Sequence, residues 1–122
     1  MTVAILGASN DEQRYSYRAQ TMLVEHGHRV IPISLSADVV LGEPAWRSLS
    51  DIPEDLKPVD TVTVYVNPTN FESVINEVLQ LRPRRVIFNP GSEHDEGANR
   101  FRDVGIEVVR ACTLVMLGLN QF

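Results

Sequence analysis

The chain alternates short apolar runs with segments whose apolar residues recur at helical spacing, and this order constrains the fold more than any other feature. The run Val3–Leu6 is uninterrupted, without the alternation of apolar and polar residues found in a strand with one wet face. Such runs are typical of parallel strands that helices cover on both faces. The order therefore predicts repeated βα units around a mainly parallel sheet.

The spacing predicts five strands joined by helices or by long connections. The predicted strands are residues 3–6, 29–33, 61–66, 85–88 and 107–109. One predicted helix follows the loop that ends at about Tyr15 and ends before Gly27, and a second starts at Pro68 and ends before Pro83. A third starts at Ser92, with Ser92 and Asp95 as its capping pair, and ends before Gly105, and a short fourth covers residues 113–119. Residues 34–58 are predicted to be a loop with one helical turn around residues 50–56. We expect an α/β three-layer sandwich with a five-stranded sheet of order 3-2-1-4-5.

Length and composition indicate a single globular domain, residues 1–122, and exclude several classes of protein. A net charge of -5 has the wrong sign for a nucleic acid partner. The single Cys112 cannot form an intramolecular disulfide, and no Cys and His cluster has zinc spacing, so no metal site is predicted. Without a signal peptide or an apolar run of about 20 residues, we expect a cytoplasmic protein with no membrane partner.

The candidate ligand site lies at the carboxyl ends of the predicted strands, where ligands bind in open parallel sheets. In the order 3-2-1-4-5, the crevice falls between the first and fourth strands. Gly7–Ser9 and Asn89–Gly91 are then expected to face each other, with Pro32–Ser34 beside them. Gly7 allows the backbone to approach a ligand, and the following helix N-terminus favours a phosphate.

The loop after the first strand does not carry the fingerprint of a dinucleotide site. Ser9 and Glu12 stand where two further glycines are required, so NAD is disfavoured. Arg14 and Arg18 are four residues apart and, together with Ser9 and Ser16, offer donors for a polyphosphate. The alternative is that both arginines form surface ion pairs with the acidic residues that precede them.

Several short motifs together resemble a known family. They are Gly7-Ala8-Ser9, Arg14, Ser16-Tyr17-Arg18, Val30-Ile31-Pro32, Val66-Asn67-Pro68, the run from Val86 to Gly91 and the run from Ala111 to Leu117. Over nearly its whole length the chain resembles the CoA-binding domain proteins, above all their small stand-alone bacterial members. Their fold is similar to the CoA-binding domain of the succinyl-CoA synthetase alpha subunit. Many relatives continue Pro-Val-Asn-Pro where this chain has Pro32-Ile33-Ser34-Leu35.

The resemblance implies a Rossmann-like domain that binds CoA or an acyl-CoA, a small-molecule nucleotide ligand. In that likeness the first loop and the stretch after it hold phosphates, and the loops after the other strands complete the site. The residues implied in cofactor binding are Gly7, Ala8, Ser9, Arg14, Ser16, Tyr17, Pro32, Ser34, Asn67, Pro68, Asn89, Pro90 and Gly91.

No catalytic residue is assigned. Cys112 could be a reactive thiol that forms a mixed disulfide with CoA, but a free cysteine in an apolar segment is more often a buried core residue. His94 lies among acidic residues at a predicted helix start and is interpreted as a surface residue. Trp46 is expected to pack at a sheet edge.

The preferred function is a non-catalytic or regulatory protein that binds CoA or acyl-CoA. One alternative is a small NAD(P)-dependent or acyl-CoA-dependent enzyme, for which only Cys112 and Tyr17 offer reactive side chains. Another is a degenerate Rossmann domain that acts as an interaction module. The apolar C-terminal segment Leu114–Leu119 either docks on the sheet or forms a homo-oligomer contact.

Overall fold

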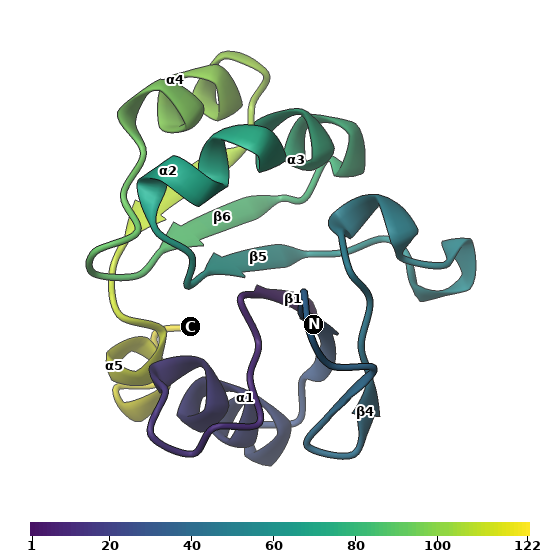
Figure 1. Ribbon diagram of the computed structural model, residues 1–122. Coiled ribbons are helices and arrows are strands. Elements are labelled where there is room, and N and C mark those ends of the chain that lie inside the picture. The colour runs from purple at the N-terminus through teal and green to yellow at the C-terminus, as the bar shows by residue number, and fades with distance from the viewer.

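The protein is built on a five-stranded parallel sheet. The computed structural model describes all residues, Met1–Phe122. The sheet has the order β2-β1-β5-β6-β7, and every neighbouring pair is parallel (Figure 1). Its strands are β1 (Thr2–Leu6), β2 (Arg29–Ile33), β5 (Thr61–Val64), β6 (Arg85–Phe88) and β7 (Glu107–Arg110). A separate two-stranded hairpin, β3 (Val39–Val40) and β4 (Glu43–Pro44), lies in the connection after β2.

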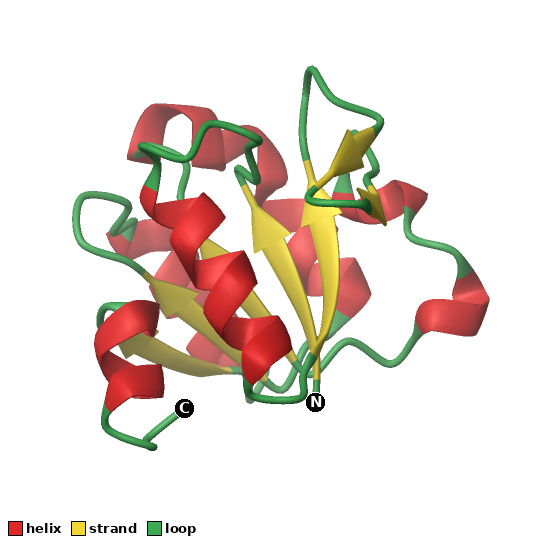
Figure 2. Cartoon of the chain, turned by 90° about the horizontal axis from the view of Figure 1, so that it is seen from below, coloured by secondary structure: helices red, strands yellow, loops and turns green.

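Helices cover both faces of the sheet, which confirms the predicted α/β Rossmann-like three-layer class. One face carries α1 (Tyr15–Glu25) and α5 (Thr113–Gly118), and the other carries α2 (Pro68–Phe71), α3 (Ile75–Leu81) and α4 (Asp95–Asp103). Figure 2 shows α1 and α5 lying across the first of these faces. None of these helices combines the length and the apolar character needed to cross a bilayer.

The central strand β1 explains why the sheet has two apolar faces. Successive side chains of a strand point to opposite faces. Val3 and Ile5 belong to the core beneath α1, while Ala4 and Leu6 belong to the larger core beneath α3, and all four are buried. The uninterrupted apolar run of β1 therefore reflects burial on both sides, as the sequence predicts.

The order 3-2-1-4-5, in which strands are numbered along the chain, is confirmed once a single-residue bridge at the outer edge of β2 is counted as a strand. Trp46 forms this parallel bridge with Ile33, so its segment is strand 3 of the order and lies at the sheet edge. Trp46 packs there on the core, as expected. The run beginning at Thr61 is expected to be strand 3 of this order, and this assignment is wrong. That run forms β5, which is strand 4 of the order and lies directly beside β1. The long connection covers the edge of β2 and then returns across the sheet, which periodicity alone does not reveal.

Local structure departs from the predicted elements at three points. The loop 34–58 contains the hairpin β3–β4 and two 3-10 turns, Leu49–Asp51 and Glu54–Leu56, instead of one turn. The predicted helix 68–82 is interrupted by a 3-10 turn at Glu72–Val74. Helix α4 is capped by His94 in place of Ser92.

The apolar C-terminal segment divides between the core and the solvent. Leu117 is buried in the core beneath α1, whereas Val115 and Leu119 on the same helix are exposed. The segment therefore docks on the domain through one face of α5. The opposite face of α5 remains available for the proposed contact between two copies of the chain.

A partly exposed ion pair between Asp60 and Arg84 links the starts of β5 and β6 at the amino end of the sheet. The Asp60 carboxylate accepts hydrogen bonds from Arg84 Nε at 2.9 Å and Arg84 Nη2 at 3.2 Å, and from Thr61 Oγ1 at 2.6 Å. Burial alone raises the pKa of Asp60, but these hydrogen bonds from Arg84 and Thr61 outweigh it and hold the pKa below its ordinary value. The ionised form is thus favoured in the folded chain.

We predict that Asp60→Asn reduces stability at neutral pH by roughly 1 kcal/mol and that this difference vanishes in acid. Because the pKa of Asp60 is lower in the folded chain, its contribution is complete above the unfolded pKa of about 3.9 and is lost as the pH falls through the folded value. Urea unfolding at pH 7 and pH 2.5 measures the effect. The control is Asp55→Asn, because Asp55 is exposed and forms no ion pair. An unchanged difference at both pH values would contradict the prediction.

Candidate functional site

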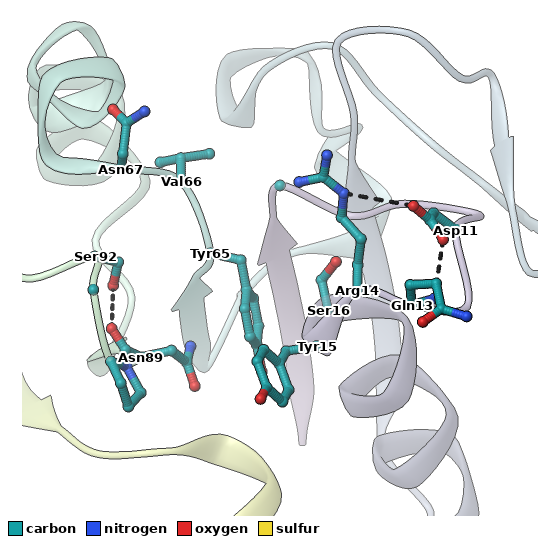
Figure 3. Close-up of a pocket in the computed structure, with 13 residues that line it drawn as sticks. Asp11, Gln13, Arg14, Tyr15, Ser16, Tyr65, Val66, Asn67, Asn89 and Ser92 are labelled. Atoms are coloured by element: carbon teal, nitrogen blue, oxygen red, sulfur yellow. Dashed lines mark hydrogen bonds and ion pairs between the residues drawn. The ribbon is translucent and has the colours of Figure 1, made fainter.

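Three neighbouring cavities run along the carboxyl edge of the sheet. The middle cavity, about 490 Å³, is lined by Gly7, Arg14, Ser16 and the loops Tyr65–Asn67 and Asn89–Ser92 (Figure 3). A β2-side cavity of about 520 Å³ meets it at Gly7, Arg14 and Val66. An α5-side cavity of about 240 Å³ meets it at Tyr15, Tyr65, Asn89 and Pro90. Together they form one elongated candidate site.

The turn at Gly7 brings two chain segments into close contact at the centre of this site. Gly7 has a φ of +92°, and its N–H and that of Ala8 both donate to the Ile33 carbonyl, at 3.1 and 3.0 Å. A Cβ at Gly7 would lie 3.2 Å from a Val66 methyl and 3.3 Å from the Tyr65 carbonyl carbon. Only glycine fits this conformation and this contact without strain.

The loop that lies beside Gly7 is not the one expected from the sequence. The loop beside Gly7 is Tyr65–Asn67, because β5 is the strand paired with β1. Asn89–Gly91 follows β6, one strand further away, and still lines the middle cavity. The expectation that Gly7 and Asn89 face each other directly across the crevice is therefore corrected.

The N-terminus of α1 opens into the middle cavity with free donors. Arg14 is the N-cap residue, and its side chain does not cap the helix. The Ser16 hydroxyl, on a residue only 2% exposed, lines the same cavity and makes no hydrogen bond within the protein. Because the first N–H groups of a helix lack intrahelical partners, this end presents donors and partial positive charge to the cavity.

The two arginines near this helix start have different positions. Arg14 lines both the middle and the β2-side cavities, and its Nε lies 4.0 Å from the Asp11 carboxylate (Figure 3). Arg18 lines none of the three cavities, and its guanidinium lies over the Tyr15 ring, 5.7 Å from the centroid. Only Arg14 is placed to meet a ligand, and of the two surface ion pairs expected as the alternative only that of Arg14 is present.

Asn89 is a structural link between three elements. Its Nδ2 group donates to Thr63 Oγ1 at 2.7 Å and to the Val64 carbonyl at 2.9 Å, both on β5. Its Oδ1 accepts from the N–H of Thr113 at 2.9 Å, at the start of α5. Both amide hydrogens and the amide oxygen are thus engaged, and the residue is only 3% exposed. Asn89 shapes the cavity wall and keeps the loop after β6 in place.

The other predicted cofactor residues fall into two groups. Those that line a cavity are Gly7, Ala8, Ser9, Arg14, Ser16, Ser34, Asn67, Asn89, Pro90 and Gly91. Tyr17, Pro32 and Pro68 line none of the three. Pro32 lies within β2, paired with Ile5, and Pro68 is an exposed residue in the first turn of α2.

Two side chains of the site were not anticipated from the sequence. Arg47 lines the β2-side cavity, and its Nη2 lies 2.8 Å from the exposed Asp38 carboxylate. Tyr65 lines the other two cavities, and its hydroxyl oxygen is buried beside the Thr63 and Thr113 hydroxyls. Arg47 lies in a connection without periodicity, so no pattern marks it. The correct strand order would have identified Tyr65, since it places that residue beside Gly7.

The two remaining candidate side chains, those of Cys112 and His94, both lie in environments that differ from the expected ones. Cys112 is half-buried and lines the α5-side cavity, so it is not the fully buried core residue that its segment suggests. His94 is only 8% exposed, and its Nδ1 accepts from the Gly97 N–H at 3.0 Å, with its ring against Phe71. The interpretation of His94 as a surface residue is therefore wrong, because the ring both caps α4 and packs on the core.

Comparison with known protein families gives one match that spans nearly the whole chain. The model of the CoA binding domain family matches residues 1–118. The matched range includes all five strands of the sheet and the loops that line the three cavities.

Solved structures share the fold along the full chain. A crystal structure of an uncharacterized protein has a TM-score of 0.91 and 43% identity, covering 99% of this chain and 97% of its own. A protein from Thermus thermophilus has a TM-score of 0.86 and 34% identity, covering 99% and 90%. An acetyl-coenzyme A synthetase of Ca. Korarchaeum cryptofilum has a TM-score of 0.76 and 22% identity, covering 90% of this chain and 25% of its own. The last likeness shows the fold alone.

We predict that Asn89→Ala destabilises the protein by about 2–4 kcal/mol, because the buried Thr113 N–H loses its partner and the Thr63 hydroxyl and Val64 carbonyl each lose one hydrogen bond. Asn67→Ala is the matched control. Asn67 also follows a strand, but it only caps α2 by accepting from Asn70 N–H at 2.8 Å, so its loss costs about 1 kcal/mol. Chemical unfolding of the two variants measures both values, and equal losses would contradict the role assigned to Asn89.

Proposed function

This chain belongs to the CoA binding domain family, and from that premise we propose that it binds CoA or an acyl-CoA along the carboxyl edge of its sheet. The proposed role is that of a non-catalytic or regulatory binding protein. The ligand is elongated, with a nucleotide at one end, a diphosphate in the middle and a thiol or thioester at the other end. Three cavities in a row provide a site of matching form.

The observation that carries the proposal is the uncapped start of α1 in the middle cavity. A free Ser16 hydroxyl, free N–H groups and the Arg14 guanidinium converge there. A helix N-terminus with an adjacent arginine is a general arrangement for binding phosphate. We assign the diphosphate to this cavity.

The two outer cavities differ in polarity, and this difference orients the ligand. The β2-side cavity has the Arg47 guanidinium and several serine hydroxyls on its wall, among them those of Ser34 and Ser48. The α5-side cavity has no charged side chain. Because the nucleotide of CoA carries a phosphate on its ribose and the thiol end carries no charge, we assign the nucleotide to the β2 side.

Arg47 is the residue we assign to the ribose phosphate. Its guanidinium is held by the Ser34 and Ala37 carbonyls, at 3.3 and 3.1 Å, and by the Asp38 carboxylate. The Asp38 side chain is 90% exposed, so its loss as a partner costs little. A ligand phosphate can replace that carboxylate while the two carbonyls keep the guanidinium in place.

Binding rather than catalysis is proposed from the state of the ionisable groups. In the middle cavity Asp11 and Arg14 pair with each other at the rim. Burial raises the pKa of Tyr65 to about 12, so this phenol stays protonated at neutral pH and is a poor general base.

A thermal-shift titration with CoA, acetyl-CoA, NAD, NADP and ATP tests the proposal. A ligand at 100 times its dissociation constant stabilises the folded chain by about 2.7 kcal/mol, which raises the melting temperature by several degrees. We expect CoA and acetyl-CoA to stabilise the protein selectively. Selective stabilisation by NAD or NADP would place the protein in the dinucleotide class, and no shift with any ligand would favour an interaction module.

The substitution Arg14→Ala is expected to weaken CoA binding about tenfold, as for the loss of a charged hydrogen bond to phosphate. Arg18→Ala is the matched control, since Arg18 lies on the same helix start and outside the cavities. Titration calorimetry measures both affinities. An unchanged affinity for Arg14→Ala would remove Arg14 from the site.

A second substitution tests the orientation of the ligand. Arg47→Gln is expected to lower the affinity for CoA about tenfold and to leave the affinity for dephospho-CoA, which lacks the ribose phosphate, nearly unchanged. Dephospho-CoA therefore serves as the internal control for any disturbance of the loop. Equal losses for both ligands would show that Arg47 supports the loop and does not contact that phosphate.

A further inference from the structure

The α5-side cavity is an apolar extension of the candidate site. Its walls come from the start of α1, the ends of β5 and β6, and α5. The lining residues are Tyr15, Tyr65, Asn89, Pro90, Cys112 and Leu114. It joins the middle cavity through the first four of these, so a ligand chain leaving the middle cavity enters it directly.

The polar groups of this cavity are few and are almost all occupied. The Asn89 amide is fully engaged with Thr63, Val64 and Thr113. The Thr63 and Thr113 hydroxyls bond to each other at 2.8 Å. The Tyr65 hydroxyl is buried beside the Thr63 and Thr113 hydroxyls and is not exposed to the cavity. The cavity therefore offers a ligand mainly apolar contact.

We propose that the α5-side cavity holds the neutral, short acyl group of an acyl-CoA. This inference rests on the proposed function, and it adds the class of thioester that the site prefers. Leu114, Pro90 and Cys112 supply the apolar contact for the acyl chain.

The size of the cavity limits the acyl group. An engineered cavity of about 150 Å³ is enough to bind benzene, a molecule of six carbons. The 240 Å³ of the α5-side cavity therefore has room for an acyl chain of about six carbons. Chains of two carbons leave most of the cavity unfilled.

The chemistry of the walls limits it further. No Lys, Arg or His side chain lines the cavity, so the free carboxylate of a dicarboxylic acyl group would be buried there without a partner. Burial of an unpaired carboxylate is costly. The cavity thus discriminates against succinyl groups and favours hexanoyl groups.

Titration calorimetry with CoA, hexanoyl-CoA and succinyl-CoA tests the inference. We expect hexanoyl-CoA to bind about tenfold more tightly than CoA, because burial of each methylene is favourable. Succinyl-CoA is expected to bind no more tightly than CoA.

A matched pair of variants locates the effect in the cavity. Leu114→Trp places a larger side chain in the cavity and is expected to abolish the preference for hexanoyl-CoA over CoA. Val115→Trp introduces the same residue on the exposed face of the same helix and should retain the preference. Circular dichroism of both variants verifies that α5 remains folded.

The outcomes separate this inference from the proposed function. Equal affinities for CoA and hexanoyl-CoA would overturn the acyl assignment and leave CoA binding intact. A preference that persists in Leu114→Trp would place the acyl group elsewhere and would also overturn it. Failure of CoA and hexanoyl-CoA alike to bind would overturn both.

Discussion

A single buried amide, that of Asn89, fixes the geometry on which the candidate site depends. It bonds β5 through Thr63 and Val64, and α5 through the Thr113 N–H. These elements come from distant parts of the chain and line the middle and α5-side cavities. The Asn89 amide therefore fixes the positions of these two cavities relative to each other. A buried network in which every member is satisfied is rigid, whereas a half-satisfied one is costly. The walls are therefore formed before any ligand arrives, which reduces the ordering that binding requires.

The charges of the site fit the proposed anionic ligand even though the whole chain is acidic. Arg14 and Arg47, the two cations of the cavities, each lie next to an exposed carboxylate, Asp11 and Asp38. Exposed ion pairs contribute little to stability, so either carboxylate can give way to a phosphate. The net charge of -5 slows the approach of a polyanion, but local contacts decide its affinity.

The fold class, all five strands and the ligand edge could be predicted from the sequence. Strands that are buried on both faces, and the glycine after β1, give clear local patterns. The place of β5 could not be derived in the same way. It depends on how residues 34–58 cover the edge of β2, and the bridge at Trp46 is a single residue with no periodicity. That one difference explains why Tyr65 and Arg47 were missed, while the loops at Gly7 and Asn89 were placed on the correct edge. His94 was misjudged for a related reason, because its contact with Phe71 joins separate elements.

The gradient of polarity along the three cavities assigns different tasks to the parts of the proposed ligand. Phosphate contacts in the middle and β2-side cavities are shared by CoA and every acyl-CoA, so they set affinity without distinguishing between them. The α5-side cavity is reached only by the part of the ligand that differs. A discrimination of tenfold corresponds to 1.4 kcal/mol, which a few buried methylenes can supply without any catalytic group. A small domain with this arrangement can therefore report the acylation state of its ligand by binding alone.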